Sequence, residues 1–172
     1  MGNTTNQLRI GRAWVGVAAA LLVAGCASYS GSGLKTGTST AAEVRRIMGE
    51  PAKICPLADG GQNLIFPRGP AGLDTYNARI DGKGILRSVE NVLDEDSFER
   101  VVRGKTTKNE LLCIFGPPLQ ETYFSARNEL VWDYRFMNVF GNPSRFHVLL
   151  DDSGVVTGTL QIEEDVKNDD RP

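Results

Sequence analysis

The chain carries the same fifteen-residue pattern twice. Residues 37–51 read GTSTAAEVRRIMGEP and residues 104–118 read GKTTKNELLCIFGPP. The aligned copies share Gly, Thr, Glu, Ile, Gly and Pro without a gap, and two further positions are apolar in both. Such a match indicates an internal duplication. The chain is therefore expected to fold as two similar units.

Each copy has the signals of a short helix. Thr40 and Thr107 are suitable N-caps, and a glutamate three residues later, Glu43 or Glu110, completes a capping box. Apolar residues then recur at spacings of three and four, which places them on one face of a helix. A glycine followed by proline ends each helix. Each unit should begin with a helix of about nine residues that packs by its apolar face.

Strand patterns follow both helices. Trp132, Tyr134 and Phe136 alternate with other residues, as in a half-buried strand, and the favoured interpretation makes them core. The expected strands are 64–66, 74–80 and 85–93 in the first unit, and 119–124, 130–136, 145–150 and 155–162 in the second. Turn signals lie at 81–84 and 151–154. A short helix at about 97–102 is expected to join the units.

These patterns predict an α+β fold of two tandem helix-plus-antiparallel-meander repeats. The first repeat spans residues 36–93 and the second spans residues 94–162. A unit of roughly 65 residues would be marginally stable by itself. The two repeats are therefore expected to pack on each other or to form one continuous sheet surface.

Cys26 closes an N-terminal apolar run. Arg9 and Arg12 precede this run, no acidic residue lies before Cys26, and the segment ends Leu-Leu-Val-Ala-Gly-Cys. It resembles a bacterial lipoprotein signal, which implies removal of residues 1–25 and acylation of the Cys26 thiol. Ala27, rather than Asp, implies an outer-membrane location facing the periplasm. The alternatives are an ordinary secretory signal and a transmembrane anchor, although the apolar core is shorter than the roughly 20 residues that span a bilayer.

The flanks of the mature chain look unstructured. Residues 26–35 are rich in Gly and Ser and are expected to form a flexible linker from the lipidated cysteine. Residues 163–172 are expected to be a disordered acidic tail. The formal charge of −2 becomes −4 once Arg9 and Arg12 are removed. This argues against a nucleic-acid-binding protein, which would normally carry a basic patch.

Cys55 and Cys113 are the two remaining cysteines. An oxidising periplasm permits a disulfide between them, and the alternative is two free thiols. Their spacing matches no metal-binding or redox motif. The sequence leaves the choice open, because the distance between the two side chains decides it.

The helix motif, with Trp-x-Tyr-x-Phe at 132–136 and Asp-x-Gly-Val-Val at 152–156, resembles the SmpA/OmlA (BamE-type) outer-membrane lipoprotein family. The tandem arrangement also resembles the β-lactamase-inhibitor-like fold. The family resemblance implies a non-catalytic accessory protein of the machinery that inserts β-barrel proteins into the outer membrane. Family members carry one such domain, whereas this chain has two. The alternatives are a periplasmic inhibitor or ligand-binding module, and an envelope stabiliser that binds the cell wall.

The sequence offers little for catalysis. His147 is the only histidine, lies within an expected strand, and is accompanied by no Gly-x-Ser-x-Gly nucleophile motif. No cluster of Cys and His suits zinc. We therefore expect no enzyme activity, no cofactor, no metal and no nucleic-acid partner.

Two segments are candidates for binding a protein partner. The first is the Pro- and Gly-rich loop that contains Arg68, Gly69 and Pro70, which is alternatively a simple turn between strands. The second is the aromatic strand with Trp132, Tyr134 and Phe136, which is alternatively core, and with Asp133 and Arg135 on its opposite face. These two charged residues are expected either to pair with each other or to face a partner.

Overall fold

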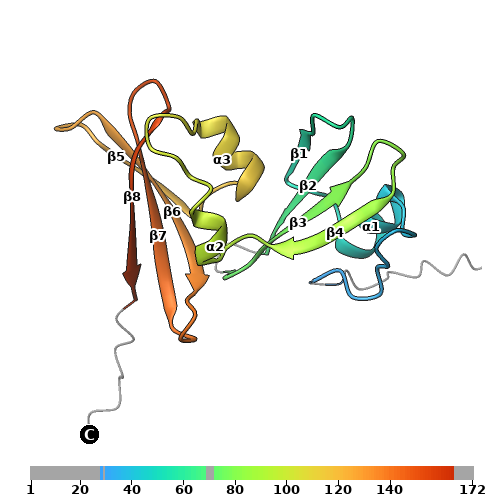
Figure 1. Ribbon diagram of the computed structural model, residues 1–172. Coiled ribbons are helices and arrows are strands. Elements are labelled where there is room, and N and C mark those ends of the chain that lie inside the picture. Colours follow the sequence, from blue (N-terminus) through green and yellow to red (C-terminus); the bar gives the residue numbers. More distant parts are fainter. Residues whose placement is uncertain (1–27, 29, 69–71, 165–172) are drawn as a thin grey trace, which may run out of the picture.

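The structure, a computed structural model, describes residues 28, 30–68 and 72–164. Its elements follow one another as two similar series (Figure 1). They are α1 (Ala41–Met48), β1 (Lys53–Pro56), β2 (Gln62–Pro67), β3 (Thr75–Ile80), β4 (Leu86–Asn91), α2 (Glu95–Phe98), α3 (Lys108–Ile114), β5 (Gln120–Phe124), β6 (Glu129–Met137), β7 (Pro143–Leu150) and β8 (Val156–Glu163). The mixed α+β class predicted from the sequence is thereby confirmed.

The strands form two antiparallel meanders. The first sheet has the order β1-β2-β3-β4 and the second has the order β5-β6-β7-β8. The sequence missed β1, because its four residues, Lys-Ile-Cys-Pro, are too few to show an alternating pattern. The joining helix α2 begins two residues earlier than expected, because the Asp94 side chain accepts a hydrogen bond from Ser97 N at 2.7 Å and caps it there.

The two halves repeat the same local hydrogen bonds. Helices α1 and α3 have complete capping boxes, as the sequence predicted. The other matched features are the Thr40–Ile85 and Thr107–Val155 bridges, the turns in which Asp81 and Asp151 accept backbone N–H groups, and the register shifts after Arg79 and Leu149. These similarities extend well beyond the fifteen-residue pattern.

Each half has its own apolar core. Val44 and Met48 of α1 are buried against the first sheet. Leu111 and Phe115, from α3 and its C-cap, are buried with the inner face of the second sheet. The aromatic stripe of β6 belongs to this second core, since Trp132, Tyr134 and Phe136 are at most 2% exposed. These three aromatic residues are thus core residues, which is the interpretation that the sequence favoured.

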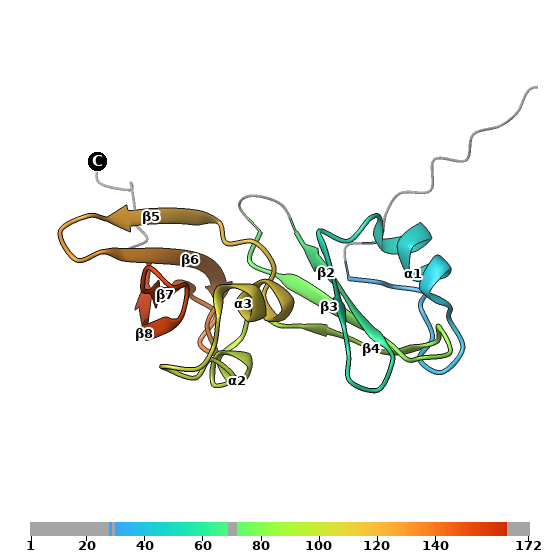
Figure 2. The same ribbon diagram turned by 90° about the horizontal axis from the view of Figure 1, so that it is seen from above.

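Helix α3 lies between the two sheets (Figure 2). Besides covering its own sheet, it contacts β1 and β2, and a disulfide joins Cys113 of α3 to Cys55 of β1, with a Cα–Cα distance of 5.8 Å. Gly116 follows the helix at φ 77°, and a Cβ there would lie 3.0 Å from Ile65 and 3.2 Å from Pro67. A side chain at this position would therefore push the halves apart. Of the two alternatives for Cys55 and Cys113, free thiols or a disulfide, the structure has the disulfide.

Both flanks take part in the structure where they are described. Leu34, in the segment expected to be a linker, packs on the first core, and Gly31 lies against it and Met48. Ser28 N donates to Ile47 O at 2.6 Å. At the other end, Glu163 belongs to β8 and Glu164 pairs with arginines of the second sheet. Residues 165–172, the rest of the expected tail, and the expected signal with Cys26 lie outside the described residues.

Candidate functional site

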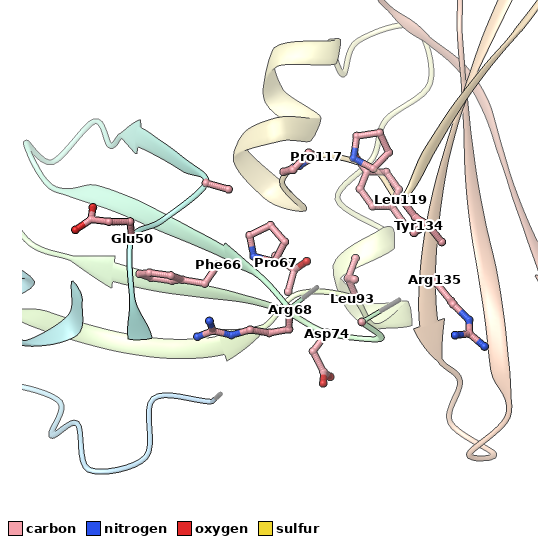
Figure 3. Close-up of a pocket in the computed structure, with 14 residues that line it drawn as sticks. Glu50, Phe66, Pro67, Arg68, Asp74, Leu93, Pro117, Leu119, Tyr134 and Arg135 are labelled. Atoms are coloured by element: carbon pink, nitrogen blue, oxygen red, sulfur yellow. The ribbon is translucent and has the colours of Figure 1, made fainter. Parts of the chain in front are cut away.

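A pocket of about 420 Å³ lies between the two halves (Figure 3). Its walls come from the end of β2, the residues after β4, the turn after α3, and β6. The apolar lining residues are Ala52, Phe66, Pro67, Leu93, Pro117, Pro118, Leu119 and Tyr134. Pockets of this size with mostly apolar walls are the usual form of a binding site for an apolar group.

Tyr134 fixes one wall of the pocket. Its hydroxyl donates to Gly116 O at 3.1 Å, and the side chain is 2% exposed. Burial raises the pKa of this phenol well above its ordinary value, so the hydroxyl stays protonated and keeps donating. The hydrogen bond ties the second sheet to the turn after α3, which carries the proline wall.

Arg68 lines the pocket, but its guanidinium points away from it (Figure 3). Its Nη1 donates to Met48 O at 3.1 Å and its Nη2 to Ser28 O at 3.4 Å, while the guanidinium carbon lies 5.4 Å from the centre of the Phe66 ring. Arg68 therefore holds the end of α1 and the start of the described chain together. Gly69 and Pro70, the other candidates in this loop, lie outside the described residues.

Arg135 also lines the pocket, while its charged group is directed to the outer face of the second sheet, the face opposite α3 (Figure 3). There Glu164 accepts hydrogen bonds from Arg135 and from Arg145, each at 2.7 Å. Arg145 also donates to Asp133, which is 8% exposed. Asp133 and Arg135 thus lie on one face, as expected, but Arg145 and Glu164 connect them.

The ion-pair cluster consists of Asp133, Arg135, Arg145 and Glu164. It shifts the pKa values of Glu164 and Arg135. Hydrogen bonds from Arg135, then from Arg145, hold the pKa of Glu164 below its ordinary value despite partial burial. The hydrogen bond to Glu164 likewise raises the pKa of Arg135. The four side chains are thus joined by hydrogen bonds and ion pairs within the second half, which suits a structural role better than direct contact with a ligand.

The structure thus brings Arg68 and Arg135 to one pocket and leaves Asp133 outside it. No sequence pattern marks Leu119, Pro117 or Glu164 as a site residue. In the sequence, the Pro-Pro pair at 117–118 indicates only the end of a helix, and Glu164 falls within the expected tail. One sequence feature could have indicated this wall of the pocket. Residues 117–119 read Pro-Pro-Leu directly after a helix, and such an apolar run either packs on another part of the protein or forms exposed apolar surface.

His147 lies in β7 opposite Asp133 and Leu160. Among the residues that the structure describes, no group of three or more His, Cys, Asp or Glu side chains could hold a metal ion. The same residues include no helix long and apolar enough to cross a membrane.

Comparisons with known proteins leave the family open. No known protein family matches the sequence, and no curated protein matches it. Among solved structures, a DUF4309 family protein (YjgB) from Bacillus subtilis subsp. subtilis str. 168 aligns over 77% of this chain and 84% of its own, with 14% identity and a TM-score of 0.30. A likeness of this degree carries no argument about fold or function.

Proposed function

We propose that this chain is a lipoprotein of the outer membrane, anchored through Cys26, that acts as a non-catalytic scaffold in β-barrel protein assembly or envelope integrity. In this proposal the two halves are tandem BamE-type repeats, and the protein works through contacts with other envelope proteins. The observation that carries the proposal is the apolar pocket between two disulfide-linked units, with Ser28, two residues after Cys26, bound beside it.

The pocket suits an apolar side chain from a protein partner. Leu119 is 39% exposed and Phe66 is buried, so the pocket offers apolar surface both at its rim and at its floor. The guanidinium groups of Arg68 and Arg135 are occupied by acceptors of the same chain. Recognition would therefore depend on shape and apolar contact, with Glu50 and Asp74 as the other charged groups in the lining.

The disulfide supports this function by keeping the pocket walls in place. One wall belongs to the first half and the other to the second, so their relative position sets the pocket's shape. A pocket that is already formed loses less conformational entropy when it binds. The Cys55–Cys113 bond joins the two halves covalently and acts against separation of the walls.

The test is an affinity pull-down with the lipidated protein from mildly solubilised outer membranes. Leu119→Lys places a charge at the pocket rim, and Val102→Lys is its matched control, because Val102 is a similarly exposed apolar residue (46%) that does not line the pocket. Arg68→Glu is less suitable, since it would break bonds to Met48 and Ser28. We expect barrel-assembly components with the wild type and Val102→Lys, and their loss with Leu119→Lys.

Two other results would change the proposal. Equal recovery with both variants would keep the partner and exclude the pocket as its binding site. No recovery of barrel-assembly components, where the other subunits of that machinery remain together, would exclude the assembly function. Stoichiometric inhibition of a periplasmic hydrolase, or sedimentation with purified cell walls, would then identify the remaining alternatives.

A further inference from the structure

The β6–β7 hairpin presents two large apolar side chains to solvent. Val139 is 76% exposed and Phe140 is 84% exposed. Both lie in the turn of residues 138–142, here called the tip, and Met137 before it is 42% exposed. Exposed apolar residues that cluster in one place, rather than singly, mark a surface that contacts something apolar.

The tip is held rigidly in this exposed position. Asn138 N donates to Asn142 O at 3.0 Å, and the Asn138 side chain accepts from Phe140 N at 3.0 Å and from Asn142 N at 2.9 Å. Val139 N lies 3.3 Å from its acceptor, a carboxylate oxygen of Glu95 in α2. These bonds fix the backbone of the tip in the conformation that leaves Val139 and Phe140 exposed.

The charges around the tip limit what it can contact. From Phe136 to Ser144 the chain has no charged residue. Behind the tip lie Glu95 and Glu163, and Glu163 accepts hydrogen bonds from the side chains of Asn138 and Asn142. Arg135 and Arg145, which flank this uncharged span, are paired with Glu164 and Asp133. An uncharged apolar end with carboxylates behind it would enter a neutral apolar surface and would be repelled by an anionic one.

The position of the lipid attachment site indicates which surface is near. Ser28 is bound to Ile47 and Arg68 of the first half, and two residues of chain span at most about 7 Å. A lipid on Cys26 would therefore hold this side of the protein close to the bilayer. The start of the described chain and the β6–β7 hairpin both lie on the lower side of the molecule in Figure 1.

We propose that the tip is a second membrane contact, in which Val139 and Phe140 insert into the interface of the bilayer that holds the lipid anchor. The lipid surface is zwitterionic rather than anionic. This inference rests on the proposed lipidation of Cys26. Insertion of two side chains is weak for a free protein, but the anchor makes it an intramolecular event with a high effective concentration. The contact would fix the orientation of the pocket relative to the membrane.

The experiment uses the lipidated protein in vesicles of phosphatidylethanolamine and phosphatidylcholine. Val139→Cys is labelled with an environment-sensitive fluorophore, since Cys55 and Cys113 are bridged and Cys26 carries the lipid. Ser125→Cys is the matched control, because it is exposed in the turn at the other end of β6. Mass spectrometry of the mature protein checks the lipid itself.

We expect spin-labelled lipids to quench the label at position 139 several-fold more strongly than the label at position 125. Phe140→Asp should reduce quenching at position 139 to the level of the control, and adding phosphatidylglycerol should weaken it. Equal quenching at the two positions in protein of the lipidated mass would overturn this inference and leave the proposed function intact. Absence of the lipid mass would overturn both.

A protein partner is the competing occupant of the tip. Protection of position 139 only when barrel-assembly components are added, and not by vesicles, would replace the membrane contact with a protein contact. Stronger insertion into anionic than into zwitterionic vesicles would overturn the assignment of the lipid surface.

Discussion

At the scale of single residues, the side chains with the most obvious chemistry are those that stabilise the fold. Arg68, Asp133 and Arg135 stand out in the sequence as charges beside turn or strand patterns, yet each is bound to acceptors or donors of the same chain. The pocket instead depends on Tyr134, whose hydroxyl joins the second sheet to the turn after α3.

Tyr134→Phe should lower the free energy of unfolding by about 1–2 kcal/mol, because it removes a buried hydrogen bond and leaves Gly116 O without its donor. Urea denaturation measures the change. The control is Tyr123→Phe, since Tyr123 is 56% exposed and its loss should cost less than about 0.5 kcal/mol. Equal effects of the two changes would contradict the importance of the Tyr134 bond.

Glu164→Gln should destabilise the protein at neutral pH but not in acid. The pKa of Glu164 is lowered in the folded state, so its contribution to stability is complete above its ordinary value of 4.5 and is lost as the pH falls through the lowered value. Because the paired side chains are 20–32% exposed, the loss at neutral pH should be on the order of 1 kcal/mol. Thermal melts of both proteins from pH 7 to acid should converge; a constant difference would refute this account.

At the scale of elements, two helices with the same capping box serve different purposes. Helix α1 covers one sheet, whereas α3 covers its own sheet and also contacts β1 and β2 of the other. In the described part of the chain, the first sheet thus has a helix on each face, and the second sheet has helices on its inner face alone (Figure 2). Disturbing α3 should therefore affect both halves, and disturbing α1 only one.

Thr107→Ala should lower the free energy of unfolding by about 1 kcal/mol, because it removes the side chain that accepts from Glu110 N at the start of α3. Thr107→Ser should keep most of that stability. Hydrogen exchange separates the two helices: Thr107→Ala should reduce protection in β1 and β2 as well as in the second sheet, whereas Thr40→Ala should affect the first half alone. Identical exchange patterns for the two alanine variants would disprove the bridging function of α3.

At the scale of the whole molecule, the disulfide and the contacts of α3 unite two units that each have a separate core. Cys55 and Cys113 are separated by 58 residues, so their bond closes a long loop of the unfolded chain. The pocket exists only while the halves keep their relative position, because its walls come from both. Stability and binding should therefore depend on the same bond.

Replacing both cysteines, Cys55→Ser with Cys113→Ser, should lower the free energy of unfolding by about 2–5 kcal/mol. Partner recovery in the pull-down should fall with it, since the pocket walls are no longer linked. Reduction of the wild-type protein should reproduce both effects, and the double variant should then be insensitive to reductant. Full stability and full binding after removal of the bond would show that the α3 contacts suffice.

The sequence by itself determined the local parts of this protein. The capping boxes at Thr40 and Thr107, the turns at Asp81 and Asp151 and the alternating strand around Trp132 were predictable, because each depends on residues a few positions apart. The strand β1 was not predictable, because its four residues have no strand pattern and become a strand by pairing with β2. The candidate site was predictable only in part: Arg68 and Arg135 were named, but without the pocket that they line.

Only the tertiary structure decided the rest. The Cys55–Cys113 bond, the second contact face of α3, the link from Asp133 through Arg145 to Glu164 and the pocket all join residues that are far apart in the chain. No local pattern encodes such distances, because they follow from how strands pair within a sheet and from how one half packs on the other. The exposure of the tip was also decided by the tertiary structure. Val139 and Phe140 are apolar, yet they lie at the end of the β6–β7 hairpin and are exposed.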